Sequence, residues 1–150
     1  LRYANERHVR TIGADINLRY RTNTGLGLMA SYNYLHTTGS TIESQFSQPR
    51  PHSATWRIEY DHRFSGNYKL YAALSGRYLS HPDTDQPTGG AYSIWKLTFR
   101  QEFYKGISLN LAIENLFDYR PKFYYWNSAI TTGIGFSAGL TLEIDRIVKH

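Results

Sequence analysis

Period-two alternation of apolar and polar residues runs through most of this chain of 150 residues, and it constrains the fold more than any other feature. In the segment 56–64, for example, Trp56, Ile58 and Tyr60 share one parity, and charged residues fill the other. Successive side chains point to opposite faces in an extended strand, so each such segment predicts a strand with one apolar and one polar face. The pattern predicts seven strands, near residues 9–21, 26–36, 53–64, 68–79, 92–104, 107–117 and 133–147.

The connections between these segments alternate in length. Short connections span residues 22–25, 65–67 and 105–106, and long ones span 37–52, 80–91 and 118–132. The short turns then lie at one end of the sheet and the long loops at the other, as membrane barrels keep short periplasmic turns and long extracellular loops. Strands of about ten residues are long enough to cross a bilayer when they are tilted. We therefore expect an all-β fold of antiparallel, up-and-down transmembrane strands.

Two soluble folds are built from similar strands, and the placement of the aromatic residues bears on them. An immunoglobulin-like sandwich fits poorly, because its Greek-key connections would not alternate strictly between short and long. A lipocalin-like barrel is also a meander, but its apolar parity would face inward. Aromatic residues make up 15% of the chain and, on the apolar parity, gather toward both strand ends. Two aromatic girdles around an aliphatic band are typical of a surface that contacts a bilayer. The predicted girdles are Trp56, Tyr78, Trp95, Phe117 and Phe136 toward the long loops, and Tyr20, Phe64, Tyr68 and Phe103 toward the short turns.

Composition excludes several other classes of protein. No window approaches the 18 or more consecutive apolar residues of a membrane-spanning helix, and the mean hydropathy is -0.51, so a helical membrane protein is excluded. The absence of cysteine excludes disulfide frameworks and thiolate metal sites. The net charge of +5 is spread along the chain among interleaved acids, so no nucleic-acid partner is expected.

A short motif, Asn115-Leu116-Phe117-Asp118, resembles the element that ends the penultimate strand in the barrels of TonB-dependent outer-membrane receptors. Segments 30–34, 49–53 and 133–142 resemble further landmarks of that family in the same order. The resemblance implies a plugged barrel of roughly twenty-two strands in the cell outer membrane, with membrane lipid around it. This chain would be its C-terminal part, and the N-terminal barrel and the plug on which TonB acts would lie upstream. An odd strand count independently favours a portion of a larger barrel, because bacterial barrels have even numbers of strands.

The resemblance implies import of a scarce nutrient, a small-molecule ligand such as an iron chelate, haem or cobalamin. The sequence does not identify which ligand is imported. A barrel that does not transport, or an adhesin, is the first alternative, and a soluble lipocalin-like binder is the second. No Ser, His and acid triad is evident, so we do not expect an enzyme, although some outer-membrane barrels are enzymes. No cofactor is expected.

Aromatic and basic residues crowd the loop 118–132, which makes it the sharpest candidate for ligand binding. Rings and cations together suit a flat or anionic ligand. The alternative is that these rings belong to the outer girdle or pack loop on loop. The candidates are Tyr119, Arg120, Lys122, Phe123, Tyr124, Tyr125 and Trp126.

Charged residues on the polar parity predict a wall that faces the lumen. They could line a polar path, hold a plug by salt bridges, or pair with one another across strands. The predicted lumen-facing residues are Arg57, Glu59, Asp61, Arg63, Lys96, Arg100, Glu102 and Glu114. The histidines His36, His52 and His81 are scattered without the spacing of metal ligands, so no metal site is predicted.

Overall fold

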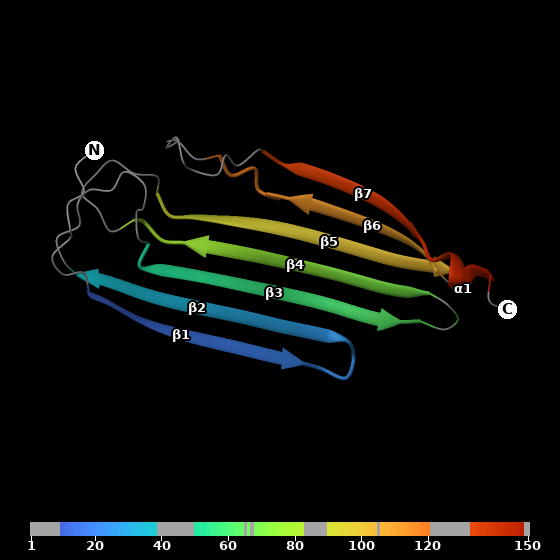
Figure 1. Ribbon diagram of the computed structural model, residues 1–150, viewed down its shortest axis with the longest axis horizontal. Helices are drawn as coiled ribbons and strands as arrows, with labels where there is room; N and C mark the ends of the chain where they lie inside the picture. The colour runs from blue at the N-terminus through green and yellow to red at the C-terminus, as the bar shows by residue number, and fades with distance from the viewer. Residues whose placement is uncertain are drawn as a thin grey trace.

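Seven β-strands form one antiparallel sheet, in which each strand pairs with the next along the chain (Figure 1). The computed structural model describes residues 10–38, 50–64, 66, 68–82, 90–104, 106–120 and 133–148. The elements are β1 (Arg10–Arg21), β2 (Leu26–Thr38), β3 (His52–Arg63), β4 (Lys69–Leu79), β5 (Tyr92–Tyr104), β6 (Ile107–Glu114), β7 (Gly135–Leu142) and α1 (Ile144–Val148). The up-and-down topology predicted from the alternation is therefore confirmed.

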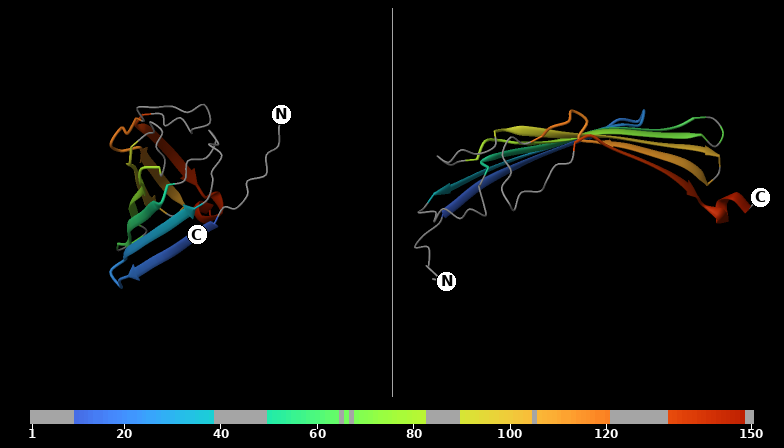
Figure 2. Two further views of the ribbon diagram at one scale, coloured as in Figure 1. Left: turned by 90° about the vertical axis from the view of Figure 1, so that its left-hand side faces the viewer. Right: turned by 90° about the horizontal axis from the view of Figure 1, so that it is seen from above.

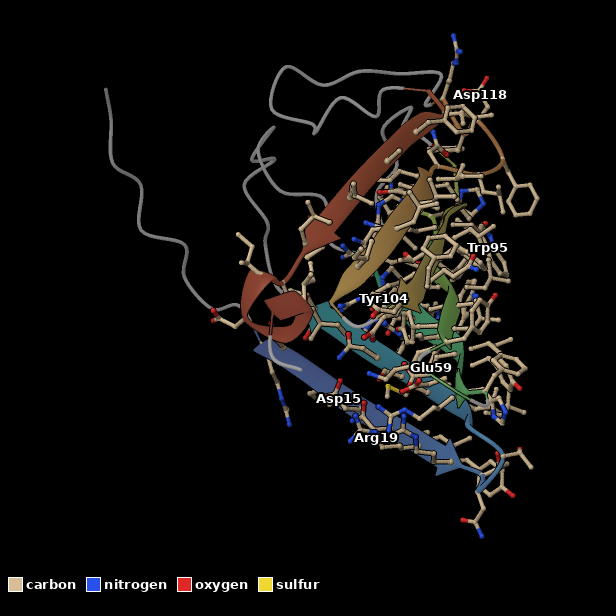
Figure 3. The ribbon with its side chains drawn as sticks, turned by 90° about the vertical axis from the view of Figure 1, so that its right-hand side faces the viewer. Asp15, Arg19, Glu59, Trp95, Tyr104 and Asp118 are labelled. Carbon is tan, nitrogen blue, oxygen red and sulfur yellow. The ribbon has the colours of Figure 1, made fainter. Side chains whose placement is uncertain are left out.

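The sheet is curved, and its two faces have opposite chemistry. Partners in an antiparallel ladder project to the same face, so the register defines rows of neighbours across the sheet. From β2 to β7, one row contains only apolar residues, namely Leu28, Ile58, Leu74, Leu97, Ile113 and Phe136. Figure 3 shows Trp95 of the apolar parity on the convex side of the sheet and Glu59 of the polar parity on its concave side. The left panel of Figure 2 looks along the strands and shows the same curvature of the sheet.

The apolar convex face is open rather than buried. Ala73 is the only buried hydrophobic residue in the described part of the chain, whereas Ile16 is 65% exposed and Phe136 76% exposed. Soluble proteins rarely leave an apolar surface of this extent in contact with water. A lipocalin-like barrel would need this parity on the concave side, so that alternative does not fit the structure.

Two predicted strands extend too far. The segment 107–117 leaves the ladder after Glu114, because Asn115 takes a left-handed backbone conformation with φ of 51° that a strand does not accommodate. The segment 133–147 is a strand only over Gly135–Leu142, and the chain then turns into α1. The backbone N–H of Glu143 donates to the carbonyl oxygen of Gly106 at 2.7 Å, which ends the pairing, and that of Ile147 donates to Glu143 at 3.2 Å. Within the described residues, no helix is long and apolar enough to cross a membrane.

The two ends of the sheet differ in the way the sequence suggests. Tight turns join β1 to β2, β3 to β4 and β5 to β6 at one end, where α1 also lies (Figure 1). Gly25 allows the first of these turns with a φ of 93°, and a Cβ there would meet the Asp61 carbonyl oxygen at 2.0 Å. The strands β3, β5 and β7 begin at the opposite end, which we call the long-loop end.

Candidate functional site

Glu59 is the centre of a cross-strand network on the concave face. Its carboxylate lies 3.1 Å from Nε of Arg57 and 3.8 Å from a guanidinium nitrogen of Arg21. The Tyr71 hydroxyl donates to it at 3.4 Å and accepts a hydrogen bond from Arg57. Gly27 leaves the room for this carboxylate, since a Cβ there would lie 2.8 Å from Cγ of Glu59. The network joins three strands, and the sequence had not indicated Arg21 or Tyr71 as members.

Two further ion pairs cross neighbouring strands. Nζ of Lys69 lies 2.9 Å from the Glu102 carboxylate, and Nζ of Lys96 lies 2.6 Å from the Glu114 carboxylate. Lys69 was not among the predicted wall residues. The other predicted members, Asp61, Arg63 and Arg100, form no ion pair with another described residue. The predicted wall is therefore only partly self-compensated.

The concave face carries more cations than carboxylates, and this sets its electrostatic character. A surface with an excess of one sign raises the local concentration of ions of the opposite sign. Along the described strands, the concave cations are Arg19, Arg21, Arg57, Arg63, Lys69, Arg77, Lys96 and Arg100, and the carboxylates are Asp15, Glu59, Asp61, Glu102 and Glu114. The wall accordingly favours anions.

The motif 115–118 forms a turn that the Asn115 side chain locks. Its amide nitrogen donates to the Tyr119 carbonyl oxygen and its amide oxygen accepts from the Tyr119 N–H, both at 2.9 Å. The backbone N–H of Asp118 donates to the Asn115 carbonyl at 2.8 Å. Asparagine tolerates the left-handed conformation better than most residues and is only 6% exposed here. The motif therefore explains where β6 ends.

Asp118 ties the two ends of the connection between β6 and β7. Its φ is also 51°, and its carboxylate accepts from the backbone N–H of Ile134 at 3.3 Å and from Nε of Arg120 at 3.1 Å. A Cβ on Gly133 would lie 2.7 Å from this carboxylate, so glycine allows the close approach. Figure 3 shows Asp118 beyond the end of the strands. Asp118 of the predicted motif therefore has a structural role in this connection, as Asn115 does in the turn.

An arginine and two tyrosines stack at the long-loop end on the concave side. The rings of Tyr92 and Tyr119 lie 4.7 Å apart and nearly parallel, and the Arg50 guanidinium lies 5.0 Å from the centre of the Tyr92 ring. Arg50 also donates to the carbonyl oxygen of Ser80 and, at 3.3 Å, to that of Gly90. We call Arg50, Tyr92 and Tyr119 the mouth stack. The stack brings together Arg50 from just before β3, Tyr92 from the start of β5 and Tyr119 from after β6. The three side chains form one surface of aromatic rings and positive charge.

The structure reaches only part of the predicted ligand-binding loop. Tyr119 belongs to the mouth stack, and Arg120 is paired with Asp118 and largely exposed. The remaining candidates, Lys122, Phe123, Tyr124, Tyr125 and Trp126, lie outside the described residues. Sequence reasoning missed Arg50 and Tyr92. Arg50 stands in the segment 49–53, which only resembled a family landmark, and Tyr92 opens β5 and alternates with the girdle residues.

Comparison with models of protein families matches residues 1–134 to the outer membrane protein β-barrel family. The chain belongs to this family. Neither the curated proteins nor the solved structures compared with it gave a match. The expected location in the outer membrane is thereby confirmed. The family match does not distinguish TonB-dependent receptors from other barrels.

In this outer-membrane β-barrel, rings cluster near both ends of the convex face. At the long-loop end, Trp95 contacts Trp56 edge-on at 4.8 Å and Phe117 at 5.7 Å between ring centres. At the short-turn end, a chain of ring contacts of 4.6 to 5.8 Å joins Tyr60, His62, Phe64 and Tyr68. Aromatic rings of this kind favour the level of lipid headgroups. The convex face is thus suited to a membrane with an interface at each end.

The acidic and imidazole groups of the barrel are dispersed. Among the described residues, no group of three or more His, Asp or Glu side chains is arranged to hold a metal ion. His52 contacts Tyr32 and Tyr34, and His62 contacts two rings of the short-turn girdle. The interactions formed by the described residues of the concave side are ion pairs, hydrogen bonds and ring stacking.

Proposed function

We propose that this barrel is part of a TonB-dependent receptor that imports a scarce nutrient, and that it acts as a transporter and not as an enzyme. The observation that carries the proposal is the mouth stack, which stands at the long-loop end of a concave wall with excess cations. A stacking surface next to a guanidinium suits a flat or anionic ligand such as an iron chelate or haem. The turn at 115–118 supports it as well, since that motif resembles the receptor family's.

In this proposal the ligand is captured outside the cell by the mouth stack and the adjoining long loops. Ion pairs such as those of Glu59 and Lys69 keep the wall rigid, and the excess cations of the wall lower the energy of an anion in the lumen. The plug and its contact with TonB belong to the part of the receptor upstream of these strands. Movement of the plug then admits the ligand.

Uptake in cells tests the proposed transport. A strain without the gene would be compared with the complemented strain for uptake of radiolabelled ferric siderophores, haem and cobalamin, each with and without TonB. We expect one ligand class to enter only when both the barrel and TonB are present. Uptake of every ligand at equal rates in all strains would contradict transport by this barrel. Uptake that needs the barrel but not TonB would indicate a passive porin and not a TonB-dependent receptor.

Substitutions in the mouth stack test the site within the full receptor. Tyr92→Ala and Arg50→Gln remove a ring and a charge, and we expect each to weaken ligand binding by about tenfold, because stacking and cation–π contacts are worth on the order of 1–2 kcal/mol. Tyr78→Ala is the matched control, since Tyr78 lies at the same end but on the convex face. Equal loss in the control, or no loss in either variant at equal surface abundance, would reject the mouth stack as the site.

A further inference from the structure

Three basic side chains lie together on the convex face at the long-loop end, where the apolar band stops. Register places His36 of β2 opposite Ile12 of β1, and Arg10 is two residues beyond Ile12 on the same face. His52 of β3 is opposite Tyr34, which is two residues from His36 on that face. Diagonal neighbours in a sheet are about 7–8 Å apart. His36 is therefore a diagonal neighbour of both Arg10 and His52, and we call these three side chains the rim cluster.

Aromatic side chains hold one member of the rim cluster in place. Nδ1 of His52 lies 2.7 Å from the Tyr32 hydroxyl, and the ring of His52 lies 5.1 Å from that of Tyr34. When the tyrosine donates this hydrogen bond, Nδ1 is the acceptor and Nε2 carries the remaining hydrogen. His52 then keeps a free donor. Arg10, His36 and His52 are all exposed, and Arg10 forms no ion pair with another described residue.

Within the described strands, no carboxylate lies on the same face as the rim cluster. Every Asp and Glu of the described strands lies on the concave face, and Arg10 is the one Lys or Arg of those strands on the convex parity. On β1, the side chains next to Arg10 toward the bilayer are aliphatic, with Ile12 and Ile16 each more than half exposed. A positive group at the border of an exposed apolar band faces the headgroup layer of a membrane, where lipid phosphates carry the opposite charge.

We propose that Arg10, His36 and His52 bind the phosphate group of a lipid in the outer leaflet, on the outside of the barrel. The guanidinium presents two parallel N–H donors to a phosphate, and each histidine adds a donor. Tyr32 and Tyr34 supply the interfacial rings beside the headgroup. The opposite girdle contains a single histidine in the described residues, His62, whose ring packs between Tyr60 and Phe64. Along the described strands, the proposed phosphate site therefore has no counterpart on the convex face at the short-turn end.

Binding of a phosphorylated lipid and of its dephosphorylated form tests this site in the full-length barrel. Native mass spectrometry of the purified protein in detergent would give dissociation constants for lipid A and for lipid A without phosphates. We expect the phosphorylated form to bind at least tenfold more tightly. We also expect the combined Arg10→Gln, His36→Gln and His52→Gln variant to lose that preference. Equal binding of the two lipids would overturn the proposal.

Two controls test whether this preference depends on the rim cluster and on lipid. His62→Gln changes a histidine of the other girdle and should keep the full preference, so a loss there would overturn the assignment to the rim cluster. Heat-modifiable gel migration checks that each variant is folded, and the single Arg10→Gln variant at an exposed position should lose about threefold even if the triple variant does not fold. Competition by inorganic phosphate at equal concentration would indicate a site for free phosphate, and lipid-independent dimerisation through this face would indicate a second copy of the chain as its partner. Either result would overturn the lipid assignment.

Discussion

Replacement of Gly76 by alanine tests whether the convex girdle is packed as tightly as the structure shows. The indole of Trp56 lies flat on Gly76, and a Cβ there would be only 2.4–2.5 Å from three atoms of that ring. The indole cannot move away freely along the sheet, because Trp95 contacts it edge-on at 4.8 Å. Gly76→Ala must therefore displace Trp56 or push the two strands apart.

The expected cost follows from three contributions. Overpacking of a filled site costs about 1–3 kcal/mol. A displaced Trp56 also loses its edge-on contact, worth about 0.5–1.5 kcal/mol. Replacement of glycine by alanine also restricts the unfolded chain, which stabilises the folded state by roughly 0.5–1 kcal/mol. The net prediction is a loss of about 1–3 kcal/mol in the free energy of unfolding. Gly139→Ala is the matched control, because nothing lies within 4 Å of a Cβ at Gly139, and it should be neutral or slightly stabilising.

Reversible denaturant unfolding of the full barrel in lipid vesicles, followed by tryptophan fluorescence, measures both variants. A double-mutant cycle with Trp56→Leu adds a second criterion, since Gly76→Ala should cost at least about 1 kcal/mol less once the indole is gone. If Gly76→Ala and Gly139→Ala differ by less than about 0.5 kcal/mol, or if the Trp56→Leu background leaves the difference unchanged, the packing argument is wrong.

Three further predictions concern polar residues, and the same unfolding measurement checks each of them. Asn115→Ala should destabilise the barrel by about 1–3 kcal/mol, because it leaves two backbone groups of Tyr119 without their partner and puts alanine in a left-handed conformation. Wild-type stability in this variant would contradict the role of the turn. Glu59→Gln should cost about 1–3 kcal/mol, since the carboxylate is largely buried and shared by two arginines; a cost below about 0.5 kcal/mol would argue against the network. Lys96→Gln should cost no more than about 1 kcal/mol and less in 1 M salt, because it and Glu114 are both exposed; a larger, salt-independent cost would contradict this.

The fold was predictable because local pattern and global architecture agree. Alternation assigned each residue to a face, and the rule that short turns join neighbouring strands then gave the order of the sheet. The two errors are at strand ends, where alternation continues but pairing does not. Phe117 kept the apolar parity of Leu111 and Ile113 past Asn115, although the backbone had already turned. Ile144 likewise continues the apolar parity of Leu140 and Leu142, yet it lies on a helix whose spacing the five-residue segment is too short to reveal.

For the candidate site, the sequence predicted only which charged residues share the concave face. Parity identified the concave residues, but partners depend on which strands are adjacent and in what register, so Arg21 was not linked to Glu59. The mouth stack joins Arg50 and Tyr92, which are more than forty residues apart in the sequence, to Tyr119. No periodicity connects such positions, because loops and strand ends bring them together. The loop 118–132 stands out in the sequence for its many rings, while the stacked partner Tyr92 was missed as one strand residue among many.

The segregation of charge between the two faces also fixes the register in which the strands pair. A slip of one residue in the pairing of β3 would exchange its faces and turn Arg57, Glu59 and Asp61 toward lipid. An Arg or Lys side chain in contact with lipid costs about 2–4 kcal/mol at the bilayer midplane, and Asp and Glu cost less. Such a slip would therefore remove a substantial part of a typical stability of roughly 5–15 kcal/mol. Register is therefore set by the strands themselves. The long connections are free of that task, so under the proposed function their composition can be selected for the ligand.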